Sequence, residues 1–129
     1  MDLGLHDRVY IVTGGTRGLG RATAEALIVD GARVVVSSRS DDNVATAADQ
    51  LGAVGIAADN ADPAAADRLV QATLDAFGRL DGALVSVGGP PPGGVMDVTD
   101  EQWRSAFESV FLGAVRLARA VATASTRML

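Results

Sequence analysis

The chain has 129 residues, of which 48% are hydrophobic and 21% charged, a composition typical of a single globular domain. Its net charge of −5 argues against a nucleic-acid surface, which needs a basic patch, and the lack of cysteine excludes a disulfide framework. No apolar run approaches the roughly 18 residues of a membrane helix, and residues 1–4 do not resemble the start of a secretory signal, so we expect a cytoplasmic protein without a membrane partner.

The first part of the chain alternates short β-rich runs with a segment of helical periodicity. Residues 9–12 and 33–37 are the β-rich runs, and we expect both to be buried strands. The helix between them is predicted to end at Gly31, since glycine favours the position just after a helix. Its expected buried face repeats at helical spacing and comprises Leu19, Ala22, Thr23, Ala26 and Leu27.

The middle of the chain continues this alternation. A second helix is expected over residues 40–51, closed by Gly52, and a weaker strand follows over residues 54–58. Asp62 and Pro63 predict the start of a third helix, because aspartate is a favoured N-cap and proline a favoured first helical residue.

The last third of the chain holds a strand, a loop and a long helix. Residues 83–86 are the fourth strand, and the GGPPPGG run at 88–94 is a loop because it suits neither helix nor central strand. Thr99 and Gln102 form a capping-box pattern that opens the helix, and Trp103 is expected in the core on its apolar stripe. The stripe continues through Ala106, Phe107, Val110, Ala114, Leu117 and Val121, and is widened beyond one face by Phe111, Leu112 and Val115.

This order of elements predicts an α/β fold, a Rossmann-type doubly wound parallel sheet in one domain over residues 1–129. Right-handed crossovers give the strand order 3-2-1-4, truncated before later strands. The fourth strand is then an edge although both of its faces are apolar. We expect this edge and the wide apolar surface of the long helix to be covered by a second copy or by polypeptide outside this sequence.

The turn after the first strand reads Thr13-Gly14-Gly15-Thr16-Arg17-Gly18-Leu19-Gly20. Its glycines allow a pyrophosphate to approach the backbone, where amide N–H groups and the positive end of the helix dipole face the anion. Gly20 would let the helix pack closely on the strand. Because the turn lies between a predicted strand and a predicted helix, as such a motif requires, it favours nucleotide binding over a purely structural role.

The spacing G-x-x-x-G-x-G after a threonine resembles that of the short-chain dehydrogenase/reductase family, and the resemblance runs from about residue 5 to residue 121. Members of this family move hydride between a nicotinamide cofactor and a carbonyl or alcohol, while the protein supplies position and electrostatics. The resemblance therefore implies an oxidoreductase with a small carbonyl or alcohol substrate. It also implies a homo-oligomer formed through the helix at residues 99–123.

The end of the second strand indicates NADP(H) rather than NAD. Ser38 stands where NAD-specific relatives carry an aspartate, whose carboxylate binds the ribose hydroxyls and repels a 2′-phosphate. Arg39 follows it, and Arg17 is the second basic residue that NADP-using relatives often carry; the alternative is that both are solvated surface arginines. Asp59 matches the family's aspartate that meets the adenine amino group, or else stabilises its own loop.

The catalytic part of the family pattern is missing. The family usually has Asn-Asn-Ala-Gly after the fourth strand, whereas this chain has Ser86-Val87-Gly88-Gly89, and Val110 stands at the position of the family's catalytic asparagine. The family's tyrosine general acid/base and its lysine have no counterpart, because the single tyrosine is Tyr10 in the first strand and the chain has no lysine. The chain is either the front half of a longer reductase or a naturally incomplete relative.

Three functions stay open on the sequence. The first is an NADP(H)-dependent oxidoreductase represented by its cofactor-binding half, and the second is a non-catalytic module for dinucleotide binding or association. The third, a methyltransferase, is disfavoured because it needs an acidic residue near Ser38 and Arg39. No catalytic residue and no metal ligand set is expected. The expected cofactor-binding residues are Gly14, Thr16, Arg17, Gly18, Leu19, Gly20, Ser38, Arg39, Asp59, Gly88 and Gly89.

Overall fold

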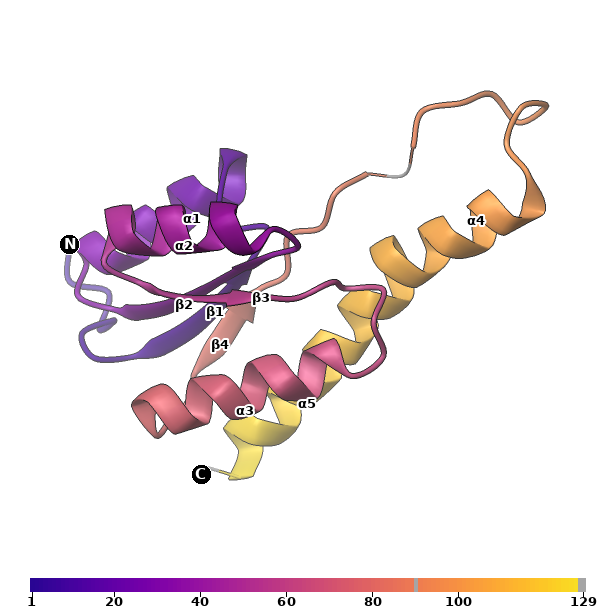
Figure 1. Ribbon diagram of the computed structural model, residues 1–129. Helices are drawn as coiled ribbons and strands as arrows, with labels where there is room; N and C mark the ends of the chain where they lie inside the picture. Colours follow the sequence, from indigo (N-terminus) through magenta and orange to yellow (C-terminus); the bar gives the residue numbers. More distant parts are fainter. Residues whose placement is uncertain (90, 128–129) are drawn as a thin grey trace.

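The computed structural model describes residues 1–89 and 91–127, which form three layers (Figure 1). The strands are β1 (Val9–Thr13), β2 (Arg33–Ser38), β3 (Val54–Ala57) and β4 (Gly82–Leu84). The helices are α1 (Gly18–Val29), α2 (Asp41–Leu51), α3 (Ala65–Phe77), α4 (Asp100–Ala106) and α5 (Gly113–Arg127), with a π-helical segment η1 (Phe107–Leu112) between the last two. Within the described ranges, no helix combines the length and hydropathy that crossing a bilayer requires.

The strands form one parallel sheet in the order β3-β2-β1-β4. This confirms the expected strand order and the Rossmann-type α/β fold. Helices α1 and α2 cover one face of the sheet, and α3 and α5 cover the other (Figure 1). The carboxyl ends of all four strands therefore meet at one edge, where their following loops come together.

Branched apolar residues of the two central strands fill the core on both faces of the sheet. Val34, Val35 and Val36 of β2 and Ile11 and Val12 of β1 are each at most 1% exposed. Successive side chains of a strand point to opposite faces. Ile11 and Val35 accordingly join the cluster under α3 and α5, whereas Val12, Val34 and Val36 join the one under α1 and α2. Burial on both faces explains why these strands read as unbroken apolar runs.

Two helix boundaries follow the expected cap chemistry. The Ser40 hydroxyl accepts a hydrogen bond from the Asn43 N–H (3.2 Å) at the start of α2, and Gly52 closes that helix at φ +71°. At the start of α4, the Gln102 N–H donates to the Thr99 hydroxyl (3.2 Å), and the Thr99 N–H donates to the Gln102 side chain (2.9 Å). These bonds confirm the predicted capping box, and Gly52 ends α2 as expected, whereas Ser40 caps α2 rather than being its first residue.

The predicted buried face of α1 is wrong at three of its five residues, whereas Leu27 is partly buried and packs against the core. Leu19 is 86% exposed, and Ala22 and Ala26 are exposed as well, whereas Gly20 and Ala24 are buried. Periodicity predicted one face, but a helix rich in alanine has little contrast in hydrophobicity between its faces. The choice depends on Gly20, which has no Cβ and lets the first turn of α1 lie directly on the glycine turn before it.

The start of α3 also differs from the prediction. The helix begins at Ala65 rather than at Pro63, and its N-cap position is Ala64. Asp62 does accept a hydrogen bond from the Ala64 N–H (2.9 Å), but in a turn that precedes the helix. An aspartate that bonds two residues onward forms an Asx turn, and the same side chain then no longer caps the helix.

The helix expected over residues 99–123 consists of three consecutive segments, α4, η1 and α5. The first of them, α4, projects from the body of the domain (Figure 1). Only α5 packs against the sheet and α3, through Leu117 and Val121, which are 2% and 8% exposed. The expectation that Trp103 lies in the core is wrong, since it is 54% exposed beside the exposed rings of Phe107 and Phe111. The Phe107 and Phe111 rings stack with their centroids 5.2 Å apart, and the apolar stripe of α4 and η1 stays largely exposed.

Asp81 joins the amino ends of β1 and β4. Its carboxylate accepts hydrogen bonds from the Val9 N–H (2.8 Å) and from two nitrogens of Arg79 (2.9 and 2.6 Å), and Arg8 lies 3.4 Å away. The bond from Arg79 is the main cause of a pKa of Asp81 below its usual value; the Val9 amide and Arg8 add to it, against the opposing effect of burial. The charged form is therefore favoured by folding. This stabilisation is present above the unfolded-state pKa of about 4 and is lost as the pH falls through the lower folded-state pKa.

Replacing Asp81 by asparagine should lower the free energy of unfolding at pH 7 by about 1–3 kcal/mol, because a neutral amide replaces a charged acceptor. The difference from wild type should shrink as the pH falls below about 4, where Asp81 itself becomes protonated. Urea unfolding of both proteins at about pH 7, 4 and 2.5 measures this difference in stability across the protonation of Asp81. Asp97→Asn, at an exposed position, is the control, and a difference that stays constant over this range would contradict the assignment.

Candidate functional site

A cavity of about 370 Å³ opens at the carboxyl ends of the strands. In the sheet, β2 lies next to β1 on one side and β4 lies next to it on the other, so the strand order reverses at β1. Open α/β sheets bind ligands at the carboxyl ends of the strands beside such a reversal. All eleven residues expected to bind a cofactor line this cavity: Gly14, Thr16, Arg17, Gly18, Leu19, Gly20, Ser38, Arg39, Asp59, Gly88 and Gly89. The fold thus brings four separate segments of the chain to one place.

Further residues line the cavity that the sequence did not single out. Six of them lie within two positions of an expected residue, at the ends of strands: Thr13, Ser37, Ala58, Asn60, Ser86 and Val87. Extending each predicted strand end by two residues would have found them. Ser109 also lines the cavity, from η1. No spacing in the sequence indicates Ser109, because its direction depends on a π-helical turn that periodicity does not reveal.

The glycine turn adopts backbone conformations that favour glycine. Gly14 and Gly18 have φ angles of +59° and +60°, in the left-handed region. Helix α1 begins at Gly18, and Arg17 at its N-cap position makes no side-chain capping bond. The first N–H groups of α1 thus have no side-chain acceptor from the cap, and the helix dipole adds partial positive charge at the cavity. This arrangement suits an anion.

Gly20 sets how closely α1 approaches the turn. A Cβ at this position would overlap the carbonyl oxygen of Gly14 and lie 2.8 Å from its carbonyl carbon. Side-chain carbons do not come this close to backbone, so the packing requires glycine. The expectation that Gly20 allows close packing of helix and strand is confirmed.

The hydroxyl of Thr13, the last residue of β1, binds the backbone of the segment that follows β4. Its Oγ1 donates to the Ser86 carbonyl (3.0 Å) and accepts from the Ser86 N–H (3.0 Å), and Thr13 is 1% exposed. The predicted strand over residues 83–86 is therefore too long: β4 ends at Leu84, because the backbone of Ser86 bonds to a side chain instead of the strand ladder. The segment leading to Gly88 is held beside the glycine turn.

The end of β2 presents a hydroxyl and a guanidinium to the cavity. Ser38 Oγ is buried and has no hydrogen-bond partner among the described residues. Arg39 and Arg17 line the same cavity and are exposed. Asp59 accepts a hydrogen bond from the Ala61 N–H (2.9 Å) through Oδ1, so it does form the loop-stabilising turn, with its second oxygen left for other contacts. Two arginines and one aspartate line the described part of the cavity, and this balance favours an anionic ligand.

The junction of η1 and α5 is pinned to the loop that follows β3. A Cβ on Gly113 would overlap the carbonyl oxygen of Asn60 and lie 3.0 Å from its Cβ. One turn earlier, Ser109 lines the cavity, whereas Val110, at the position of the family's catalytic asparagine, does not. Across residues 1–89 and 91–127, no three His, Cys, Asp or Glu side chains gather as a metal site.

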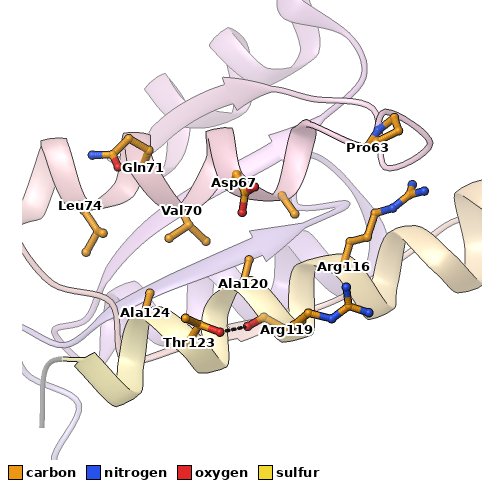
Figure 2. Close-up of a pocket in the computed structure, with 11 residues that line it drawn as sticks. Pro63, Asp67, Val70, Gln71, Leu74, Arg116, Arg119, Ala120, Thr123 and Ala124 are labelled. Carbon is orange, nitrogen blue, oxygen red and sulfur yellow. Dashed lines mark hydrogen bonds between the residues drawn. The ribbon is translucent and has the colours of Figure 1, made fainter.

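A second hollow of about 620 Å³ lies between α3 and α5, away from the strand ends (Figure 2). Val70 and Leu74 on α3 face Ala120 and Ala124 on α5, and Asp67, Gln71, Arg116 and Arg119 line its borders. Although this hollow is larger, it lacks the glycine turn and the strand ends that position polar groups. We therefore place the functional site at the smaller cavity.

The strand order, the glycine turn and the cavity at the strand ends define a Rossmann-type α/β domain. A family model described as short chain dehydrogenase matches residues 8–128. The chain belongs to this family of oxidoreductases.

The relatives that the chain matches are about twice its length. It is 38% identical over 122 residues to a Streptomyces virginiae protein provisionally named as a ketoacyl reductase of monensin polyketide synthase, covering 90% of this chain and 46% of that protein. It is 31% identical over 116 residues to the 3-oxoacyl-(acyl-carrier-protein) reductase FabG of Escherichia coli, covering 88% and 48%. The structure of L-sorbose reductase from Gluconobacter frateurii, complexed with NADPH and L-sorbose, superposes with a TM-score of 0.90 at 29% identity, covering 99% and 51%.

Gly20→Ala should lower the free energy of unfolding by about 1–3 kcal/mol, because the added methyl group meets rigid backbone rather than a movable side chain. Gly88→Ala is the matched control, since nothing lies within 4 Å of a Cβ at that position and its φ is not positive. Chemical denaturation of the two variants measures the contrast. Equal stabilities would show that α1 does not depend on this contact.

Proposed function

We propose that the protein is an NADP(H)-dependent short-chain oxidoreductase, and that residues 1–129 are its cofactor-binding half. The reaction is hydride transfer between the nicotinamide ring and a small carbonyl or alcohol. Membership of the short chain dehydrogenase family supports the reaction class. The residues around the cavity support the choice of cofactor.

The observation that carries the choice of cofactor is the end of β2, where Ser38 and Arg39 line the cavity in place of a carboxylate. A carboxylate at the end of β2 would repel a phosphate, whereas here the hydroxyl is followed by Arg39, with Arg17 on the facing turn. A guanidinium offers a phosphate both charge and paired N–H donors. Together these side chains fit the 2′-phosphate that distinguishes NADP from NAD.

The other expected residues fit the remainder of a dinucleotide. The backbone of the glycine turn, from Gly14 to Gly20, would hold the pyrophosphate against the start of α1. Asp59 has an oxygen available for the adenine amino group, and Gly88 and Gly89 would form the wall beside the nicotinamide ribose. When bound, the cofactor supplies the hydride donor or acceptor; these residues bind and orient it.

A tyrosine–lysine pair for proton transfer is not among these 129 residues. The sequence has no lysine, and the ring of Tyr10 lies against Gly82 in the sheet rather than at the cavity. This observation favours a second candidate, a dinucleotide-binding module that does not itself catalyse. Both candidates share the same cofactor site.

Wild-type protein should bind NADPH more tightly than NADH, and Arg39→Ala should reduce that preference by about 10- to 150-fold. This corresponds to roughly 1.5–3 kcal/mol for a hydrogen-bonded phosphate–guanidinium contact. Calorimetric titration of both cofactors measures it. Arg104→Ala is the control, because Arg104 is exposed on α4 and does not line the cavity. Equal affinities of the wild-type protein for NADPH and NADH would contradict the assignment of NADP(H) as the cofactor.

We also propose that the protein self-associates through the helix at residues 99–123. Trp103, Phe107 and Phe111 are 54%, 54% and 59% exposed along α4 and η1, and a contiguous exposed aromatic stripe of this kind is typical of an interaction surface. A symmetric dimer would apply the same stripe from each copy. Strand β4 is a second candidate surface for self-association, because it is an open edge of the sheet and its last residue, Leu84, is exposed.

The double substitution Phe107→Glu and Phe111→Glu should weaken self-association at least about 10-fold, since it places like charges in an apolar contact. Sedimentation velocity over a range of protein concentrations provides the measurement. Val29→Glu changes an apolar residue that is 79% exposed on α1 and should have no effect. A wild-type chain that stays monomeric at high concentration would rule out this surface as an interface.

A further inference from the structure

Ser109 is the cavity-lining residue that neither the sequence pattern nor the family resemblance indicates. It comes from η1, where the chain makes a π-helical turn between two α-helical segments. The other lining residues belong to the strand ends, the glycine turn and the loops that follow the strands.

The position of Ser109 relative to the loop after β3 follows from the packing of Gly113. Gly113 lies one helical turn further along and contacts the backbone of Asn60 so closely that a Cβ would overlap it. Asp59 and Asn60 themselves line the cavity. Ser109 therefore stands at the wall formed by this loop. Under the proposed function, that wall holds the adenine ring.

The hydrogen bonds of Ser109 determine what it can offer a ligand. Its hydroxyl donates to the Ser105 carbonyl (3.1 Å) and, more weakly, to the Ala106 carbonyl (3.4 Å). A serine hydroxyl has one proton and two lone pairs, and the proton is engaged inside the helix. The oxygen is thereby fixed as an acceptor toward the cavity. A matching ligand group must be a hydrogen-bond donor.

Resting on the proposed NADP(H) site, we infer that the Ser109 hydroxyl accepts a hydrogen bond from the exocyclic amino group of adenine. That amino group has two N–H donors, and Asp59 has one oxygen available for the first of them. Ser109 accepts the second, so both donors are satisfied at the wall formed by the loop after β3 and η1. Ser109 is a specificity-determining residue that selects adenine over a base with an oxygen at the same ring position.

Adenosine 2′,5′-bisphosphate and inosine 2′,5′-bisphosphate test this selection by calorimetric titration of the chain. They differ in the amino group and the oxygen that replaces it, and neither contains nicotinamide. Wild type should prefer the adenosine compound. Ser109→Ala should reduce that preference by about 2- to 12-fold, the effect of one neutral hydrogen bond. Ser109→Thr keeps the hydroxyl and should restore it.

Ser105→Ala is the matched control, since Ser105 is exposed one turn earlier and does not line the cavity. An unchanged base preference in Ser109→Ala overturns the inference, and so does equal weakening of both compounds, which would indicate a structural role in η1. Those results leave the NADP(H) site standing if Arg39→Ala still weakens both bisphosphates. If wild type binds neither compound, the proposed function fails and the inference fails with it.

Discussion

The contact of Gly20 with the Gly14 backbone is the constraint on which the site depends. Because no side chain separates them, the first turn of α1 lies directly on the turn that leaves β1. This contact fixes which face of α1 packs on the sheet. It also brings the uncapped N–H groups at the start of α1 to the cavity. A larger residue at position 20 would move α1 away from the glycine turn and displace the N–H groups that the start of this helix turns toward the cavity.

The remaining walls of the cavity are also held by short contacts that involve the backbone. Thr13 fastens Ser86 through two hydrogen bonds, which keeps the chain after β4 beside the glycine turn. Gly113 packs on Asn60, which keeps η1 beside the loop after β3. Backbone contacts at glycines and one buried hydroxyl thus position the polar lining groups. Ser38, by contrast, has a buried oxygen that the described residues leave without a partner, as a binding site often does.

The helix that follows residue 99 shows how one continuous apolar stripe has two different environments. Leu117 and Val121 of α5 are buried against α3 and the sheet, whereas Trp103 and Phe107 of the projecting part are more than half exposed. The π-helical turn lies between the two parts. Such turns occur frequently at functional sites, and here the turn directs Ser109 to the cavity.

The sequence by itself determined the order of strands and helices, the parallel sheet and eleven of the residues that line the cavity. The fold and the glycine turn follow from local rules: apolar runs mark buried strands, glycines mark the turn, and parallel strands bring their carboxyl ends to one edge. The cofactor residues outside the glycine turn were expected from the resemblance to the short-chain dehydrogenase/reductase family. Asp59, Ser38 and Gly88 are far apart in the chain, yet each lies at or after the carboxyl end of a strand, and they therefore line one cavity.

Only the tertiary structure decided the buried face of α1, the exposure of Trp103 and the role of Ser109. An alanine-rich helix has no dominant apolar face, so the close approach at Gly20 makes the choice. Trp103 lies on an apolar stripe, but burial requires a packing partner, and α4 extends beyond the sheet. Ser109 reaches the cavity through a π-helical turn held by the packing of Gly113 on Asn60. Each of these depends on contacts between segments distant in sequence, which local patterns do not encode.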